Sequence, residues 1–220
     1  MKASVVPVPV ARDATRTTVS AFGVFAGLAG LEHGVGEVLQ GNAAPAGVVI
    51  ESWPGSEAFR ILAGEPAMTV VPNLLVTGIL AIFVSLVFLV WVTVFVHRKH
   101  GGLGLILLSL VMLFVGAGFG PPMLGLFLGA AATRINAPST MWSRLPDGAR
   151  RLLAGLWPWS FAAGVLAWLM VMPGTMVLDH FVGVNNPELV VPVLTFSALG
   201  LLLLTILAGS ARDARPTKEL

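Results

Sequence analysis

The chain contains no cysteine and few charged residues for its length. Without cysteine it can form no disulfide, no thiolate nucleophile and no cysteine-ligated metal site, which excludes a disulfide-stabilised fold. Only 11% of the 220 residues are Asp, Glu, Lys or Arg, whereas a soluble domain usually has about 25%. So few charges cannot cover a globule of this size, and we therefore exclude a soluble domain, a disordered chain and a nucleic-acid-binding protein.

Motifs of common enzyme classes are also missing. The sequence has no phosphate-binding P-loop, no dinucleotide fingerprint, no H-E-x-x-H zinc motif and no G-x-S-x-G nucleophile elbow. Residues 1–16 lack the apolar core, about 7 to 15 residues long, of a cleavable signal peptide, and we interpret them as a cytoplasmic tail. Function must therefore be sought in the few polar groups within the apolar part of the chain.

Apolar residues make up 56% of the chain and give a mean hydropathy of +0.88. This predicts an all-α fold, a polytopic helix bundle in the cell membrane with one transmembrane domain over residues 17–210. A helix needs about 20 mostly apolar residues to cross the hydrocarbon layer. Six spanning elements are predicted, at about residues 17–40, 71–96, 103–119, 121–135, 152–182 and 189–208, followed by a short tail at 211–220.

The third and fourth elements are separated only by a Gly- and Pro-rich cluster at Gly116–Pro122. One unbroken helix over residues 103–134 would be about 48 Å long, which exceeds the roughly 30 Å layer. Proline ends one helix and can begin the next, so we predict a hairpin that either crosses fully or is re-entrant.

Placing the N-terminus in the cytoplasm puts all 13 Lys and Arg residues except Arg60 on the cytoplasmic side. This matches the positive-inside bias and predicts that both termini are cytoplasmic. The longest loop, residues 41–70, is then external. It is either a plain connection or a lid over the outer helix ends.

A short sequence in the first span, Leu31-Glu32-His33-Gly34-Val35-Gly36, is echoed near the end of the fifth as Leu178-Asp179-His180-Phe181-Val182-Gly183. The echo indicates a parallel internal repeat of spans 1–2 and 5–6. In a chain rich in Leu, Val and Gly, chance is the alternative explanation.

Ionisable groups inside a membrane face a bundle interior, a cavity or each other, and they often mark a functional site. We expect such a site in the outer leaflet, formed by His33, Glu37, Asp179 and His180, with Glu32 as a further member. Asn73, at the start of the second span, is another ligand-contacting candidate. His33, Glu37, Asp179 and His180 could ligate a divalent metal or pass protons, or the two histidines could hold a haem between them. The alternative is that each acid–histidine pair only caps a helix.

These features favour a small transporter or a ligand-binding membrane protein whose partners are the lipid bilayer and a small molecule or ion. The rival interpretations are a metal- or haem-dependent membrane enzyme acting on a lipidic or quinone-like substrate, and a structural subunit of a membrane complex. Glycine faces at Gly23, Gly27, Gly30 and Gly34, and at Gly125 and Gly129, predict close helix packing within the bundle or in a homo-oligomer.

Reporter fusions test the predicted orientation. Fusions after residue 100, near residue 140 and at Leu220 should be active as cytoplasmic reporters, and fusions within residues 41–69 as external ones, because the basic residues are so unequally distributed. A cytoplasmic signal from residues 41–69 would contradict the orientation and the outer location of the polar site.

Overall fold

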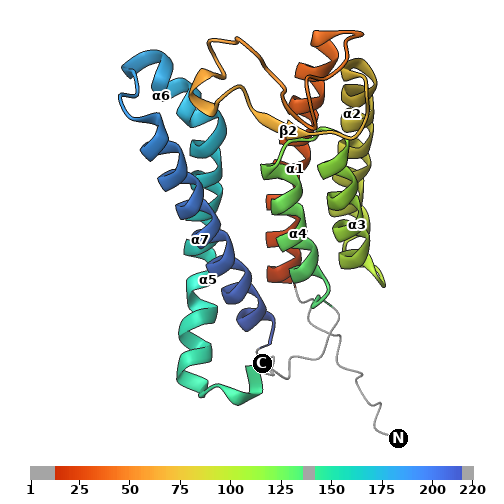
Figure 1. Ribbon diagram of the computed structural model, residues 1–220. Helices are drawn as coiled ribbons and strands as arrows, with labels where there is room; N and C mark the ends of the chain where they lie inside the picture. Colours follow the sequence, from red (N-terminus) through yellow and green to blue (C-terminus); the bar gives the residue numbers. More distant parts are fainter. Residues whose placement is uncertain (1–12, 136–141, 215–220) are drawn as a thin grey trace, which may run out of the picture.

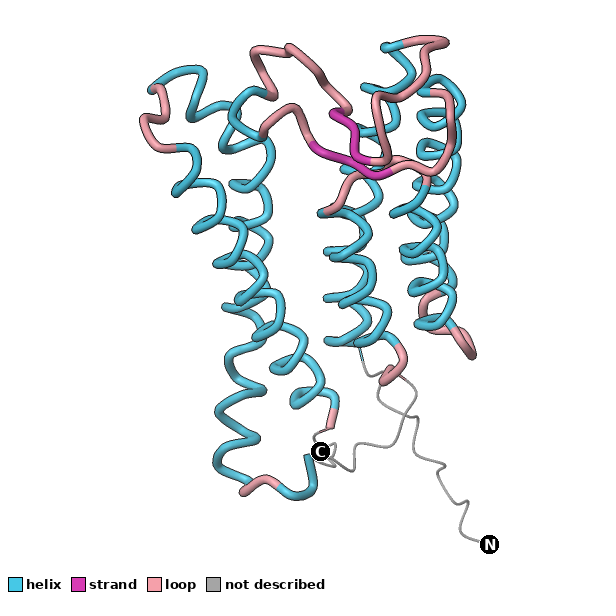
Figure 2. The backbone as a smooth tube through the Cα atoms, in the orientation of Figure 1, coloured by secondary structure: helices cyan, strands magenta, loops and turns pink. Residues whose placement is uncertain are grey.

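The computed structural model describes residues 13–135 and 142–214, and this part of the chain is almost entirely helical (Figure 1). The helical elements are α1 (Asp13–Gln40), α2 (Leu74–Val90), η2 (Trp91–Phe95), α3 (Gly101–Phe114), α4 (Gly120–Ala132), η3 (Trp142–Arg144), α5 (Asp147–Leu169), η4 (Met170–Gly174), α6 (Thr175–Val182) and α7 (Pro187–Asp213). The α1–α2 loop, residues 41–73, contains β1 (Val49–Glu51), the short helix η1 (Arg60–Leu62) and β2 (Pro66–Met68). Figure 2 shows this loop and its strand pair at one end of the helices.

Local sequence signals account for several helix ends. Asn73 caps α2, because its side-chain oxygen accepts a hydrogen bond from the Val76 amide at 3.1 Å. Prolines occupy the first turn of α4, where their missing N–H groups are not needed. Gly183 follows α6 with a φ of +76°, a backbone angle that glycine adopts more readily than other residues.

Four helical runs in the described residues are long and apolar enough to cross a membrane: Ala14–Gln40, Leu74–Phe95, Asp147–Val182 and Pro187–Asp213. Helices α3 and α4 have 14 and 13 residues, about 20 Å each at 1.5 Å per residue. Large apolar side chains such as Phe83 and Phe196 are exposed on the outside of the bundle, as membrane proteins require. The prediction of an all-α fold is therefore confirmed, with four helices long and apolar enough to cross a membrane, while the count of six spans, the orientation and the repeat stay predictions.

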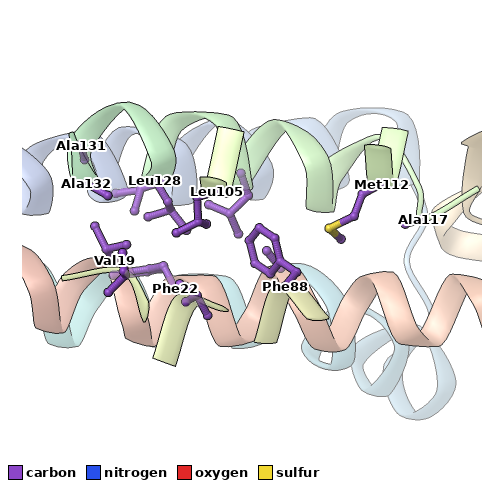
Figure 3. Packing of buried hydrophobic residues seen from close by; sticks show 14 of the residues in the cluster. Val19, Phe22, Phe88, Leu105, Met112, Ala117, Leu128, Ala131 and Ala132 are labelled. Atoms are coloured by element: carbon purple, nitrogen blue, oxygen red, sulfur yellow. The ribbon is translucent and has the colours of Figure 1, made fainter. Parts of the chain in front are cut away.

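The hydrophobic core lies among α1, α2, α3 and α4 (Figure 3). Phe22 of α1 and Phe88 of α2 are fully buried, and Leu105 of α3 and Leu128 of α4 pack in the same cluster. In a bilayer such contacts stabilise the bundle chiefly through close van der Waals packing, because lipid is as apolar as the side chains.

The predicted glycine face of α1 packs against α2 within the chain. A Cβ on Gly27 would lie 2.5 Å from the Leu89 side chain, and one on Gly34 would lie 2.8 Å from the carbonyl oxygen of Gly78. Gly36, which is off this face, is also tightly packed: a Cβ there would collide with the carbonyl oxygen of Ser52.

The second glycine face, on α4, packs inside the chain as well. A Cβ on Gly129 would lie 2.6 Å from the Ile106 side chain of α3, and Gly125 packs against Ser109 of the same helix. Both glycine faces are therefore used for contacts within one chain, and the homo-oligomer stays a prediction.

The helices form two groups that meet at one end of the bundle and separate toward the other (Figure 1). At the closed end, the Asp213 carboxylate of α7 accepts hydrogen bonds from the backbone amides of Ala14 and Thr15 at 3.0 and 2.9 Å. At the open end the α1–α2 loop crosses from one group to the other, and Arg60 pairs with Asp179 of α6 at 3.4 Å. Of the two alternatives for this loop, a lid over the helix ends agrees with this arrangement.

A pair of glycine-to-alanine variants tests the close packing of α1 on α2. Gly34→Ala should destabilise the protein by about 1–3 kcal/mol, because its new methyl group would press on the α2 backbone. Gly200→Ala, in α7 where nothing lies within 4 Å of the added Cβ, should be neutral or slightly stabilising. Thermal unfolding of purified protein in detergent measures both, and equal melting temperatures would show that α1 and α2 do not pack as described.

Candidate functional site

His33 and Glu37 lie one turn apart on α1 and are almost completely buried, with 1% and 0% of their surfaces exposed. An i, i+4 spacing places two side chains on the same helix face. This face is turned toward the α1–α2 loop and the α3–α4 connection. The two residues that the sequence selected on α1 are thus brought together in the protein interior.

Ser52 joins the two side chains. Its Oγ lies 2.8 Å from His33 Nδ1 and donates a hydrogen bond to Glu37 Oε1 at 3.3 Å. A serine hydroxyl has one proton, so when Ser52 donates to the Glu37 carboxylate it accepts from a protonated His33 Nδ1. The other ring nitrogen, Nε2, therefore faces away from Ser52, toward Glu65.

Glu65 Oε2 lies 3.2 Å from His33 Nε2. Glu32, the neighbour of His33 on α1, also contributes, because one ligand atom from each of Glu32, His33 and Glu65 lies within 4.8 Å of the other two. Both Glu32 carboxylate oxygens are buried and have no hydrogen-bond partner among the described residues. We call Glu32, His33, Glu37, Ser52 and Glu65 the His33 cluster.

The strand pair explains how loop residues reach α1. Beyond the register pair Glu51 and Pro66, the ladder continues with the Ser52 amide donating to the Glu65 carbonyl at 3.0 Å. Ala63, Gly64 and Glu65 all have left-handed backbones, with φ of 52°, 69° and 56°. Left-handed non-glycine residues are uncommon and are often found at functional sites.

Two glycines of the α3–α4 connection complete the enclosure. Gly116 and Gly118 have φ of +91° and +80°, which disfavour other residues. A Cβ on Gly116 would collide with the Glu37 carboxylate, and one on Gly118 with His33 Nε2. The Gly-rich cluster thus allows the backbone to approach the two buried polar side chains directly.

The other residues selected from the sequence lie elsewhere. Asp179 accepts a hydrogen bond from the Val184 amide at 3.1 Å and pairs with Arg60, and His180 is exposed with its ring edge against Phe181. Within the described chain no hydrogen bond or ion pair joins His180 to His33. Asn73 is the cap of α2 and is no part of the His33 cluster.

The sequence echo therefore has two different local structures. Gly36 continues α1, which ends at Gln40, whereas Gly183 lies just beyond α6. The first copy is covered by the α1–α2 loop, and the second is at an exposed helix end. Ser52 and Glu65 were missed because they lie in that loop, where no periodicity indicates which side chains face inward.

A cavity of about 720 Å³ lies beside the His33 cluster. Its walls are α1 and α4 on one side and α5, η4 and α7 on the other, and η1 lies across its end. Apolar side chains such as Leu28, Leu124 and Val191 form most of the lining. His33, Glu65 and Arg60 supply polar groups at the end beneath the loop.

Comparison with known proteins gives no assignment: no family model, curated protein or solved structure matches this chain.

Removing the Ser52 hydroxyl tests the buried connection between His33 and Glu37. Ser52→Ala should lower stability by about 1–3 kcal/mol, because two buried polar groups would lose their shared partner. Ser197→Ala, at an exposed position of α7, is the matched control and should change stability by less than about 0.5 kcal/mol. Thermal unfolding of both variants in the same detergent is the measurement, and an unaltered melting temperature for Ser52→Ala would contradict the network.

Proposed function

We propose that this chain is a ligand-binding membrane protein that takes up an elongated, mostly apolar molecule with one polar end. The observation that carries the proposal is the cavity of about 720 Å³. Ligand sites in proteins typically have volumes of about 300 to 1,000 Å³, with apolar walls and a few polar groups that fix orientation. This cavity has both properties.

The distribution of side chains supports one orientation of the ligand. Leu124 of α4, Trp168 of α5 and Val191 of α7 offer an apolar channel between the helix groups, while His33 and Glu65 lie at the loop end. The apolar part of the ligand would therefore extend between the helices, and its polar group would meet the imidazole and carboxylate.

The cavity also has access from the side. Leu28 and Leu169 line it, yet they keep 53% and 42% of their surfaces exposed. In a bilayer these side chains would face lipid, so an apolar ligand could enter from the hydrocarbon layer without crossing water. With the proposed orientation, the polar end would lie in the outer leaflet.

The loop supplies a cover for the polar end. Arg60 of η1 lines the cavity and pairs with Asp179 of α6, so one side chain connects the loop to the far wall. The Arg60 side chain is 69% exposed, and an ion pair this exposed contributes little stability. A weak connection of this kind suits a cover that must open for the ligand.

A membrane enzyme acting on a lipidic or quinone-like molecule is the second candidate. It is favoured by His33 and Glu65 at the cavity wall, with Glu32 close to them, since carboxylates and an imidazole can transfer protons or hold a metal. A haem held between His33 and His180 receives no such support. The His33 nitrogens face Ser52 and Glu65, and His180 lies exposed against Phe181.

Filling the cavity tests ligand binding. Ala29 lines the cavity, and Ala29→Phe should raise the dissociation constant of cis-parinaric acid, a fluorescent fatty acid, by about tenfold or more (about 1.4 kcal/mol). Fluorescence titration of the protein in detergent gives the constant. Native mass spectrometry of the same samples should detect a co-purified apolar molecule in the wild type and less of it in the variant.

The matched control is Ala163→Phe, which adds the same bulk at an exposed position of α5 outside the cavity. It should bind the probe as the wild type does. Equal probe affinity for Ala29→Phe and the wild type would contradict the proposal that this cavity is the binding site.

A further inference from the structure

The geometry points to a divalent metal site at the wall of the cavity, with Glu32, His33 and Glu65 as ligands. One ligand atom from each residue lies within 4.8 Å of the others. The site differs from the set expected from the sequence, because Glu65 takes part and Asp179 and His180 do not.

The position of the His33 ring is the first argument. Its Nδ1 lies 2.8 Å from Ser52 Oγ, on the side of Glu37, so Nε2 is the nitrogen that faces Glu65 and could bind a metal. In a neutral imidazole whose proton is on Nδ1, Nε2 has a lone pair directed at Glu65 Oε2, 3.2 Å away. Two lone pairs at this distance repel each other unless a proton or a metal ion lies between them.

Charge balance is the second argument. Glu32, Glu37 and Glu65 surround a single imidazole, and both oxygens of Glu32 are buried without a hydrogen-bond partner in the described chain. The Trp53 indole N–H is likewise buried without a hydrogen-bond partner in the described chain. Buried charges are normally paired or coordinate a metal, and one dication would neutralise the Glu32 and Glu65 carboxylates together.

Nearby basic side chains do not supply that charge. Arg60 is the one Lys or Arg among the described residues that line the cavity, and its guanidinium pairs with Glu57 and Asp179. Its side chain is 69% exposed, so it is directed toward solvent rather than toward Glu32. The described residues thus offer the Glu32 carboxylate no Lys or Arg partner, and a bound dication would supply the positive charge.

The distance between the ligand atoms and the contacts that hold the His33 ring also fit a metal site. Two ligands about 2.1 Å from a tetrahedral ion lie about 3.4 Å apart, close to the 3.2 Å between His33 Nε2 and Glu65 Oε2. Ser52 and Glu37 fix the orientation of the imidazole from behind, as partners of metal-bound histidines do. One imidazole and two carboxylates suit Zn²⁺, Mn²⁺ or Fe²⁺. Three protein ligands leave a coordination position for a cavity ligand, but the metal site does not depend on that ligand.

Metal analysis of the full chain tests the site. Protein purified in detergent without a histidine tag, stripped with a chelator and dialysed against Zn²⁺ or Mn²⁺, should bind one ion per chain by mass spectrometry of the metals. Glu65→Gln and Glu32→Gln should each weaken binding at least about tenfold, and circular dichroism checks that both variants fold. The control is Glu57→Gln, which changes a carboxylate of the same loop with 93% of its side chain exposed, and it should bind as the wild type does.

Spectroscopy gives a second test of the metal site, because a His33 with a purely structural role would not couple to the metal ion. In Mn²⁺-loaded protein, pulsed electron paramagnetic resonance should detect one coupled imidazole nitrogen, which should be missing in His33→Gln. Less than one ion per chain, or wild-type affinity in both glutamate variants, would overturn the metal site.

The ligand-binding proposal and the metal-site proposal can be rejected independently of each other. Ala29→Phe should lose cis-parinaric acid but keep its metal ion, whereas Glu65→Gln should lose the ion whether or not the cavity accepts the probe. Metal binding without probe binding would reject the ligand proposal alone, and probe binding without a stoichiometric ion would reject the metal proposal alone.

Discussion

His33 joins three separate parts of the chain around one imidazole ring. Nδ1 contacts Ser52, Nε2 faces Glu65, and the Gly118 backbone packs against the ring. A polar ring this deeply buried must have its nitrogens satisfied, so the strand pair and the α3–α4 connection are held against α1 together. The position of the loop, the cover of the cavity and the arrangement of the acidic side chains all follow from that requirement.

Much of the fold could be predicted, because apolar runs and turn-forming residues indicate helices and turns from the local sequence alone. Each of the six predicted apolar stretches is helical, and the Gly- and Pro-rich cluster does separate α3 from α4. The strand pair was not predicted, because its strands have three residues each, too few for an alternating pattern to be recognised. The stability of such short strands depends on contacts with α1 and with the α3–α4 connection, which are distant in sequence.

The site was predicted only in part, and the reason differs between residues. Membrane depth and helical spacing singled out His33 and Glu37, since charged groups are rare in such a helix. Similarity of sequence wrongly suggested that Asp179 and His180 would share the surroundings of Glu32 and His33, but one copy lies within a helix and the other at a helix end. Glu65 could be found only from the left-handed backbone of residues 63–65, which depends on tertiary packing.

The hydrogen bonds of Asp213 to the first turn of α1 have a mechanical consequence. They join the two helix groups at one end, while the ion pair of Arg60 with Asp179 is a weak link at the other. Helix α7 has 27 residues and is therefore about 40 Å long. A tilt of about 5° about its fixed end would move its far end by roughly 3.5 Å. Because α7 forms part of the far wall of the cavity, such a tilt would change the width of the cavity, and the side chains at the closed end would be its pivot.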